Sequence, residues 1–208
     1  MAQYGRFDGD YGMKLAASAA ADPIYMLSLM KYRAEAYYGN GAERGLAGRE
    51  ADCRYAPLDE MLGAGAYLCF AGDVLASHGG WDSVGVVRFP TRQSFMDMIS
   101  RSDFRQRHVH REAGMERIIT MGTLPVGGLP AEAGGNRTLV EVWSGSAPEP
   151  MADGSVAGFD VEGTVIGDGR GWTGARYTAI EPGTALPLEP PRRGHEALLV
   201  EPRIARWL

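Results

Sequence analysis

Residues 81–124 read WDSVGVVRFPTRQSFMDMISRSDFRQRHVHREAGMERIITMGTL, and this stretch predicts a strand, two helices and a second strand. The apolar run Trp81–Phe89 predicts the first strand. Thr91 is a good N-cap for a helix whose apolar residues recur at helical spacing. Ser102 predicts the start of another helix, and the apolar run Arg117–Leu124 predicts the closing strand.

Upstream residues extend this pattern. Ile24–Tyr32 (IYMLSLMKY) is apolar at nearly every position, as in a strand that is covered on both faces. Residues 33–54 carry charge and glycine with little periodicity, which predicts a long loop. Pro57 predicts a helix start, and residues 66–77 predict another strand. The order β-α-β-β-α-β is that of a ferredoxin-like unit.

The second half of the chain resembles the first. At an offset of 91 positions, residues 56–81 align without a gap, and Trp81 falls on Trp172. This predicts an internal duplication in which the Pro-rich stretch Pro182–Pro191 replaces the second helix, since it cannot form a regular helix. The predicted strands of the second copy are Arg137–Trp143, Gly158–Ile166, Trp172–Ile180 and Glu196–Ile204.

We therefore predict an α+β fold, with a ferredoxin-like domain followed by a degenerate, mostly β second copy. The expected boundaries are an N-terminal extension 1–22, a domain 23–125, a linker 126–136 and a second half 137–208. A sheet with helices on one face must bury its other face. Two such sheets, face to face, would enclose an apolar cavity in a dimeric-α/β-barrel-like arrangement, and such cavities bind small molecules.

Composition excludes several classes of protein. The net charge of −5 argues against a nucleic-acid partner, which requires a basic face. No apolar run reaches the ~18 residues of a membrane span. Two cysteines, Cys53 and Cys69, are too few for a disulfide scaffold. We expect a cytoplasmic protein without a cofactor or a metal site, because no nucleotide-binding or metal-binding motif is present.

The stretch from Pro23 to about Leu124 resembles the DUF1330 family of the dimeric α/β-barrel superfamily. The resemblance rests on Ile24–Tyr32, on WDSVGVVRFPT at 81–91 and on SDFRQRHVHREA at 102–113. It covers about half of the chain and implies a fold but little about activity. The wider superfamily includes cyclases, cofactor-free monooxygenases, isomerases and haem proteins, so the fold does not determine the reaction.

Two histidines are the first candidates for acid–base chemistry. His108 and His110 are two positions apart on a predicted helix, so their side chains point about 200° apart and cannot share a metal ion. Either histidine would suit a general base at neutral pH. The alternative for each is a solvated or hydrogen-bonded helix histidine.

Other polar candidates lie at predicted strand ends. His78 and Asp82 flank a turn, where a contact between them would orient the imidazole for proton transfer; the alternative is a polar hairpin tip. Lys31 and Arg33 end the first strand, where either cation would stabilise a substrate oxyanion. The alternative is an ordinary charged strand end.

Four aromatic residues are candidates for substrate binding. Trp81 and Trp172 occupy equivalent places in the two copies and would sandwich a planar ligand or simply form core. Tyr25 and Tyr32 on the first strand complete the set. The Gly-rich loop 39–52 is long enough to be a lid.

These features lead to three hypotheses of function. The first is an enzyme that acts on an apolar aromatic or polyketide-like substrate by cofactor-free acid–base chemistry, as a cyclase, isomerase or monooxygenase. The second is a non-catalytic ligand-binding or assembly module, which could be a homodimer. The third is a haem-binding protein with one histidine ligand.

Overall fold

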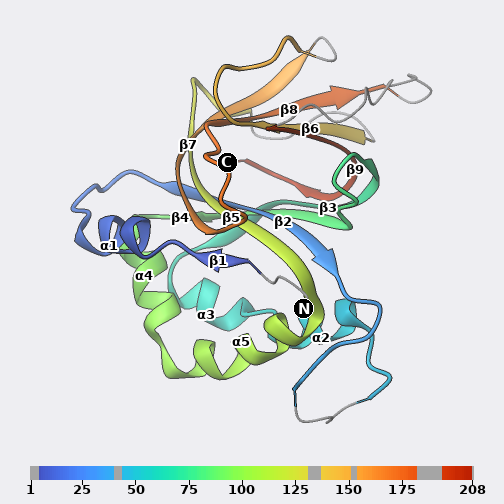
Figure 1. Cartoon of the computed structure of the whole chain (residues 1–208). Coiled ribbons are helices and arrows are strands. Elements are labelled where there is room, and N and C mark those ends of the chain that lie inside the picture. Colours follow the sequence, from blue (N-terminus) through green and yellow to red (C-terminus); the bar gives the residue numbers. More distant parts are fainter. Residues whose placement is uncertain (1–4, 40–43, 131–136, 151–153, 182–193, 208) are drawn as a thin grey trace.

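The computed structural model describes residues 5–39, 44–130, 137–150, 154–181 and 194–207. Its main feature is a barrel of antiparallel strands with a layer of helices on one side (Figure 1). The strands are β1 (Arg6–Phe7), β2 (Ile24–Tyr32), β3 (Tyr67–Ser77), β4 (Ser83–Phe89), β5 (Met115–Pro125), β6 (Arg137–Trp143), β7 (Ser155–Gly167), β8 (Gly174–Ile180) and β9 (His195–Ala205). The helices are α1 (Gly9–Ala17), α2 (Gly48–Tyr55), α3 (Leu58–Gly63), α4 (Arg92–Ser100) and α5 (Ser102–Gly114).

The predicted fold class, a ferredoxin-like domain followed by a second α/β-barrel half, is wrong. The strands form one continuous sheet in the order β1-β7-β5-β2-β4-β3-β9-β6-β8, and pairing of β7 with β8 closes eight of them into an antiparallel barrel. Hydrogen bonds between β3 and β9 and between β5 and β7 join the two halves of the chain. Closure removes the unpaired edges that two separate sheets would expose, which is the physical reason for this arrangement.

Alternation along the strands sorts side chains to the two faces of the barrel. Tyr25, Leu27 and Leu29 on β2 point into one buried cluster to which all eight barrel strands contribute, so this cluster is the barrel interior. Trp207, which follows β9, is fully buried in the same cluster. Packed side chains therefore fill the space where the sequence predicted a cavity between two sheets.

The other face of the first-half strands carries the helices. Ile24 and Met26 of β2 pack with Phe95 and Met98 of α4 and with Phe104 of α5 in a second buried cluster. At the N-cap of α4, the side chain of Thr91 accepts a hydrogen bond from Ser94 N, and Thr91 N donates to the Ser94 hydroxyl at 3.2 Å. The predicted cap is thereby confirmed.

Two helices lie where the sequence predicted none. Part of the expected loop 33–54 is helix α2, which packs against α5. Part of the expected extension 1–22 is helix α1, whose Tyr11 covers Gly163 of β7 and donates a hydrogen bond to Glu162 Oε1 at 3.0 Å. A side chain at position 163 would collide with the Tyr11 ring.

The second half contributes β6 to β9, and all four of its predicted strands are present. Within the described ranges it has no helix, whereas the stretch Pro182–Pro191 and residues 131–136 of the predicted linker lie outside those ranges. The order β9-β6-β8-β7 places the second-half strands as β5-β2-β4-β3 places those of the first half. The internal duplication and the domain boundaries remain predictions.

Candidate functional site

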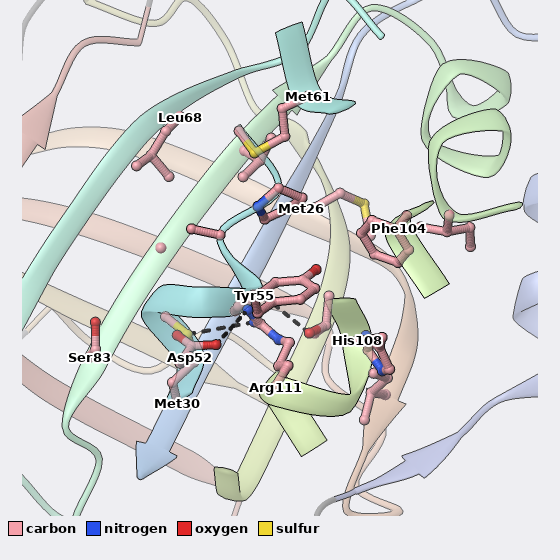
Figure 2. Close-up of a pocket in the computed structure, with 18 of the residues that line it drawn as sticks. Met26, Met30, Asp52, Tyr55, Met61, Leu68, Ser83, Phe104, His108 and Arg111 are labelled. Atoms are coloured by element: carbon pink, nitrogen blue, oxygen red, sulfur yellow. Dashed lines mark hydrogen bonds and ion pairs between the residues drawn. The ribbon is translucent and has the colours of Figure 1, made fainter. Parts of the chain in front are cut away.

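A cavity of about 780 Å³ lies between the outer face of the first-half strands and the helices. This volume is within the range of small-molecule sites. Figure 2 shows methionine and aromatic side chains toward one end and Asp52, Met30 and Arg111 close together at the other. The apolar wall includes Met26, Met61, Leu68, Val87, Phe89, Phe95, Met98 and Phe104, and the polar wall includes Ser28, Tyr32, Asp52, Ser83, His108, Arg111 and Thr120.

Small residues on two paired strands make room for the cavity floor. Ser28 of β2 pairs with Gly85 of β4, and both line the cavity. The Ser28 hydroxyl lies 3.1 Å from that of Thr120 on β5. In the second half, the strand pair β6–β8 instead places Glu141 opposite Arg176. There the two large side chains form a buried ion pair instead of leaving space.

Two glycines determine where helix α2 lies. A Cβ atom at Gly48 would collide with the carbonyl oxygens of Arg33 and Gly114, so only glycine allows this approach. Gly48 N donates to Arg33 O at 3.2 Å, and Arg33 N donates to Gly114 O at 2.9 Å. These contacts hold α2 against the end of α5 and bring Asp52 to Arg111.

Asp52 is the centre of the polar end. Its carboxylate accepts hydrogen bonds from the Tyr32 hydroxyl and from Arg111 Nη1, each at 3.3 Å. The other terminal nitrogen of Arg111 lies 3.6 Å from Met30 Sδ, and the guanidinium lies 4.6 Å from the ring centroid of Tyr55. The side chains of Asp52 and Arg111 are only 15% and 14% exposed, so this ion pair is shielded from water.

Burial also determines the protonation of two cavity groups. It raises the pKa of Tyr32 to about 12, with a further contribution from the negative charge of Asp52, so the phenol remains a hydrogen-bond donor. Burial lowers the pKa of His108 below 6.5, the Arg111 charge adds to this effect, and Glu112 opposes it. The imidazole is therefore neutral at pH 7 and can accept a proton.

The structure separates the two candidate histidines. His108 lines the cavity, where its ring stacks on Phe104 at 5.9 Å and its Nε2 lies 3.8 Å from Glu112 Oε1. His110 is not among the lining residues, and its Nδ1 is hydrogen-bonded to the Tyr38 hydroxyl at 2.9 Å. The helical spacing of two residues accounts for this separation.

The candidates at the strand ends form a different arrangement from the predicted one. Asp82 accepts a hydrogen bond from Lys31 Nζ at 3.2 Å and another from Tyr32 N at 2.8 Å, so it holds the end of β2. The structure shows no bond between Asp82 and His78, which lies in the turn after β3. Arg33 contributes backbone hydrogen bonds to α2 and to the end of α5. Among these residues, Tyr32 alone lines the cavity.

The other three aromatic candidates belong to the barrel interior. Tyr25 packs on Phe159 with ring centroids 5.4 Å apart. Trp81 and Trp172 are in the same cluster, and each has an arginine over its ring, Arg117 at 4.3 Å and Arg170 at 4.2 Å. These side chains lie on the opposite face of the sheet from the cavity.

Asp52 and Arg111 were missed in the sequence. Residues 48–55 (GREADCRY) are so polar that no apolar stripe marks them as a helix. Ala51 and Tyr55, which are four positions apart, give the only helical spacing, and it is too short to decide. Arg111 lies within the stretch 102–113 that carries the family resemblance, and the sequence gives it no separate role.

The described residues contain neither a cluster of metal ligands nor a membrane-spanning helix. In the part of the chain that the structure describes, no three His, Cys, Asp or Glu side chains gather as metal ligands would. None of the described helices is both long and apolar enough to cross a bilayer.

Comparisons with known proteins support the fold alone. No family model matches the chain, so the DUF1330 resemblance gains no support there, and no curated protein matches. Two crystal structures of RPA0582, a protein of unknown function from Rhodopseudomonas palustris, are 23% and 22% identical, with TM-scores of 0.55 and 0.53. They cover 61% and 60% of this chain and 98% of their own.

A candidate monooxygenase from Lactobacillus acidophilus NCFM is 12% identical over 89% of this chain and 96% of its own, with a TM-score of 0.44. These neighbours are of a dimeric α/β-barrel-like type. At these identities the likeness concerns architecture, and the last TM-score is too low to bear on function.

Proposed function

We propose that this protein is a small-molecule enzyme that binds an apolar aromatic or polyketide-like substrate in the cavity between barrel and helices. The observation that carries the proposal is the division of the cavity into a long apolar wall and a short polar end that contains a neutral imidazole, a phenol and a guanidinium. Pockets with a few convergent polar groups and shifted pKa values are typical of active sites.

In the proposed reaction, His108 is the general base. Its neutral imidazole takes a proton from a carbon or hydroxyl that a neighbouring carbonyl or aromatic ring makes acidic. The negative charge that appears on the substrate oxygen is stabilised by Arg111 and by the hydroxyl of Tyr32. Return of the proton to another carbon gives an isomerase, and attack of the carbanion on a second carbonyl gives a cyclase. Addition of O₂ to the carbanion, followed by loss of water from the resulting hydroperoxide, oxidises the substrate carbon to a carbonyl, as in a monooxygenase; the substrate supplies all the electrons.

The first experiment asks whether the cavity binds a ligand at all. Gly85→Val adds a side chain to the cavity floor, where its Cβ would make only ordinary contacts with Met30 and Leu68. Gly158→Val is the matched control on β7, because its surroundings are open and it lies outside the cavity. Native mass spectrometry of the purified proteins should show a bound small molecule in wild type and in the control and lose it in Gly85→Val.

The second experiment tests the base on the substrate that the first one identifies. His108→Ala should lower kcat/KM by about 10²–10⁴-fold, the usual contribution of a general base. His110→Ala is the control, since it changes a histidine two residues away that lies outside the cavity. Equal losses in both variants would refute the role of His108. A bound ligand that is never converted would favour a non-catalytic binding module.

A further inference from the structure

The polar end of the cavity already holds an anion, which is the carboxylate of Asp52. Tyr32 and Arg111 donate to it from two sides, as they would to the carboxylate or enolate oxygen of a ligand. A substrate oxyanion at this end would therefore compete with Asp52 for the same two donors. Either the ligand avoids these donors, or the side chain of Asp52 moves.

The hydrogen bonds of Asp52 are long for a buried ion pair. Both measure 3.3 Å, whereas charge-assisted bonds are typically about 2.7–2.9 Å for N–H···O and about 2.5–2.7 Å for O–H···O. Arg176 and Glu141 in the second half provide an internal comparison. Two nitrogens of Arg176 donate to one Glu141 oxygen at 2.9 and 2.8 Å, and Glu141 is fully buried. The Asp52 carboxylate is thus held by longer hydrogen bonds than the Glu141 carboxylate.

Asp52 also has an alternative cation within its own helix. Arg49 lies three positions earlier on α2, and residues at this spacing are neighbours on a helix surface. The Arg49 guanidinium, which lines the cavity, is 5.2 Å from the ring centroid of Tyr32 and also pairs with Asp73. Because Arg49 is a neighbour of Asp52 on the surface of α2, it offers a second cation toward which a displaced Asp52 carboxylate would turn.

We propose that Asp52 is an internal stand-in for the acidic group of the ligand, and that an aromatic ligand with one carboxylate or enolate oxygen displaces it from Arg111 and Tyr32. This inference rests on the proposed function and names the ligand class of the same site. Neutral ligands leave Asp52 in place and lack a charge-assisted bond to Arg111. Asp52 thereby determines specificity, because only a ligand that offers a better anion gains these donors.

The test compares two probes of the same shape, anthracene-9-carboxylate and its neutral isostere anthracene-9-carboxamide. Fluorescence titration gives Kd values for both probes with wild type and with Asp52→Asn, which keeps the shape of the side chain and removes its charge. The carboxylate should bind the variant about 10–100-fold more tightly, which corresponds to one charge-assisted hydrogen bond regained. The affinity for the carboxamide should change little.

Glu112→Gln is the matched control for a general effect of charge. It removes a carboxylate that lines the same cavity but is 59% exposed, so its effect on the probe is screened by water. An equal gain in both variants would overturn the inference. Tyr32→Phe in the Asp52→Asn background should weaken binding of the carboxylate and leave binding of the carboxamide unchanged.

A crystal structure of the wild type with anthracene-9-carboxylate gives a readout that does not depend on the folding of any variant. The probe carboxylate should contact Arg111, and the Asp52 carboxylate should have left it. If the probe binds while Asp52 keeps its hydrogen bonds, the inference is wrong and the proposed function stands. If neither probe binds wild type or Asp52→Asn, the cavity is not a ligand site, and both proposals fall.

Discussion

Replacement of Trp207 by alanine is the most direct test of how the barrel interior is filled. Trp207 is fully buried although it is the next-to-last residue of the chain. Its ring centroid lies 5.6 Å from that of Phe70, 5.3 Å from that of Phe159 and 4.8 Å from that of Tyr177. The backbone next to it is anchored, because Arg206 N donates to Cys69 O at 2.7 Å.

The expected magnitude follows from these contacts. Truncation of a buried Trp or Phe to Ala costs about 3–5 kcal/mol, and three neighbouring rings place Trp207→Ala toward the upper end. For a chain of about 150–250 residues, each kcal/mol lowers Tm by about 2–4 °C. The variant should therefore melt about 6–20 °C below wild type. Trp207→Phe keeps an aromatic ring in place and should lose less.

Thermal unfolding followed by circular dichroism measures this difference. Because Trp207 does not line the candidate site, the folded variant should bind anthracene-9-carboxamide at 15 °C, a temperature that is about the usual maximum of protein stability, as wild type does. A Tm within about 2 °C of wild type would refute a packed interior, since it implies a loss of less than about 1 kcal/mol. Loss of probe binding in a folded variant would instead show that packing in the barrel interior affects ligand binding in the cavity.

Three further predictions concern single residues. At pH 8, iodoacetamide should modify the exposed Cys53 and spare Cys69, because burial raises the pKa of the Cys69 thiol to about 12. Peptide mass spectrometry measures the labelling of each cysteine. Because Cys53 lines the cavity, a bound ligand should slow its labelling. Gly163→Ala should destabilise the fold by about 1–3 kcal/mol in urea unfolding because it displaces the ring of α1 that covers this glycine, whereas Gly158→Ala should be nearly neutral. Burial lowers the pKa of His108, so the imidazole binds a proton more tightly in the unfolded chain than in the folded one. The free energy of unfolding should therefore fall as pH drops through 6.5 and level off below the folded-state pKa. Urea unfolding of His108→Gln between pH 8 and pH 5 should show a smaller fall.

Local patterns in the sequence predicted the strands well because alternation and apolar runs are local signals. The strand Arg137–Trp143 has the predicted bounds, and the cap at Thr91 is where its residue type places it. Closure of the barrel is different. The contacts of β3 with β9 and of β5 with β7 join segments far apart in the chain, and nothing in either strand alone specifies its partner. The fold class was therefore wrong although most elements were right.

The candidate site shows the same division between local and distant information. The angle between His108 and His110 follows from helix geometry, so the sequence could state that at most one of them would face a given cavity. The position of Asp52 depends on backbone contacts of Gly48 with Arg33 and Gly114. A glycine in a polar stretch of sequence does not indicate which distant backbone atoms it will contact. Residues brought together by a close backbone approach are those that sequence patterns miss.

The two halves of the barrel have the same strand order, but their outer faces differ: one borders the cavity and the other carries an ion pair. Where β2 and β4 place Ser28 opposite Gly85, the outer face has room for a ligand beneath the helices. Where β6 and β8 place Glu141 opposite Arg176, the chain fills the space with its own ion pair. A fully buried glutamate requires its cation, because an unpaired charge at that depth is strongly destabilising. We therefore expect a ligand anion to displace Asp52 in the first half, whereas separation of Glu141 from Arg176 in the second half would leave a buried charge unpaired.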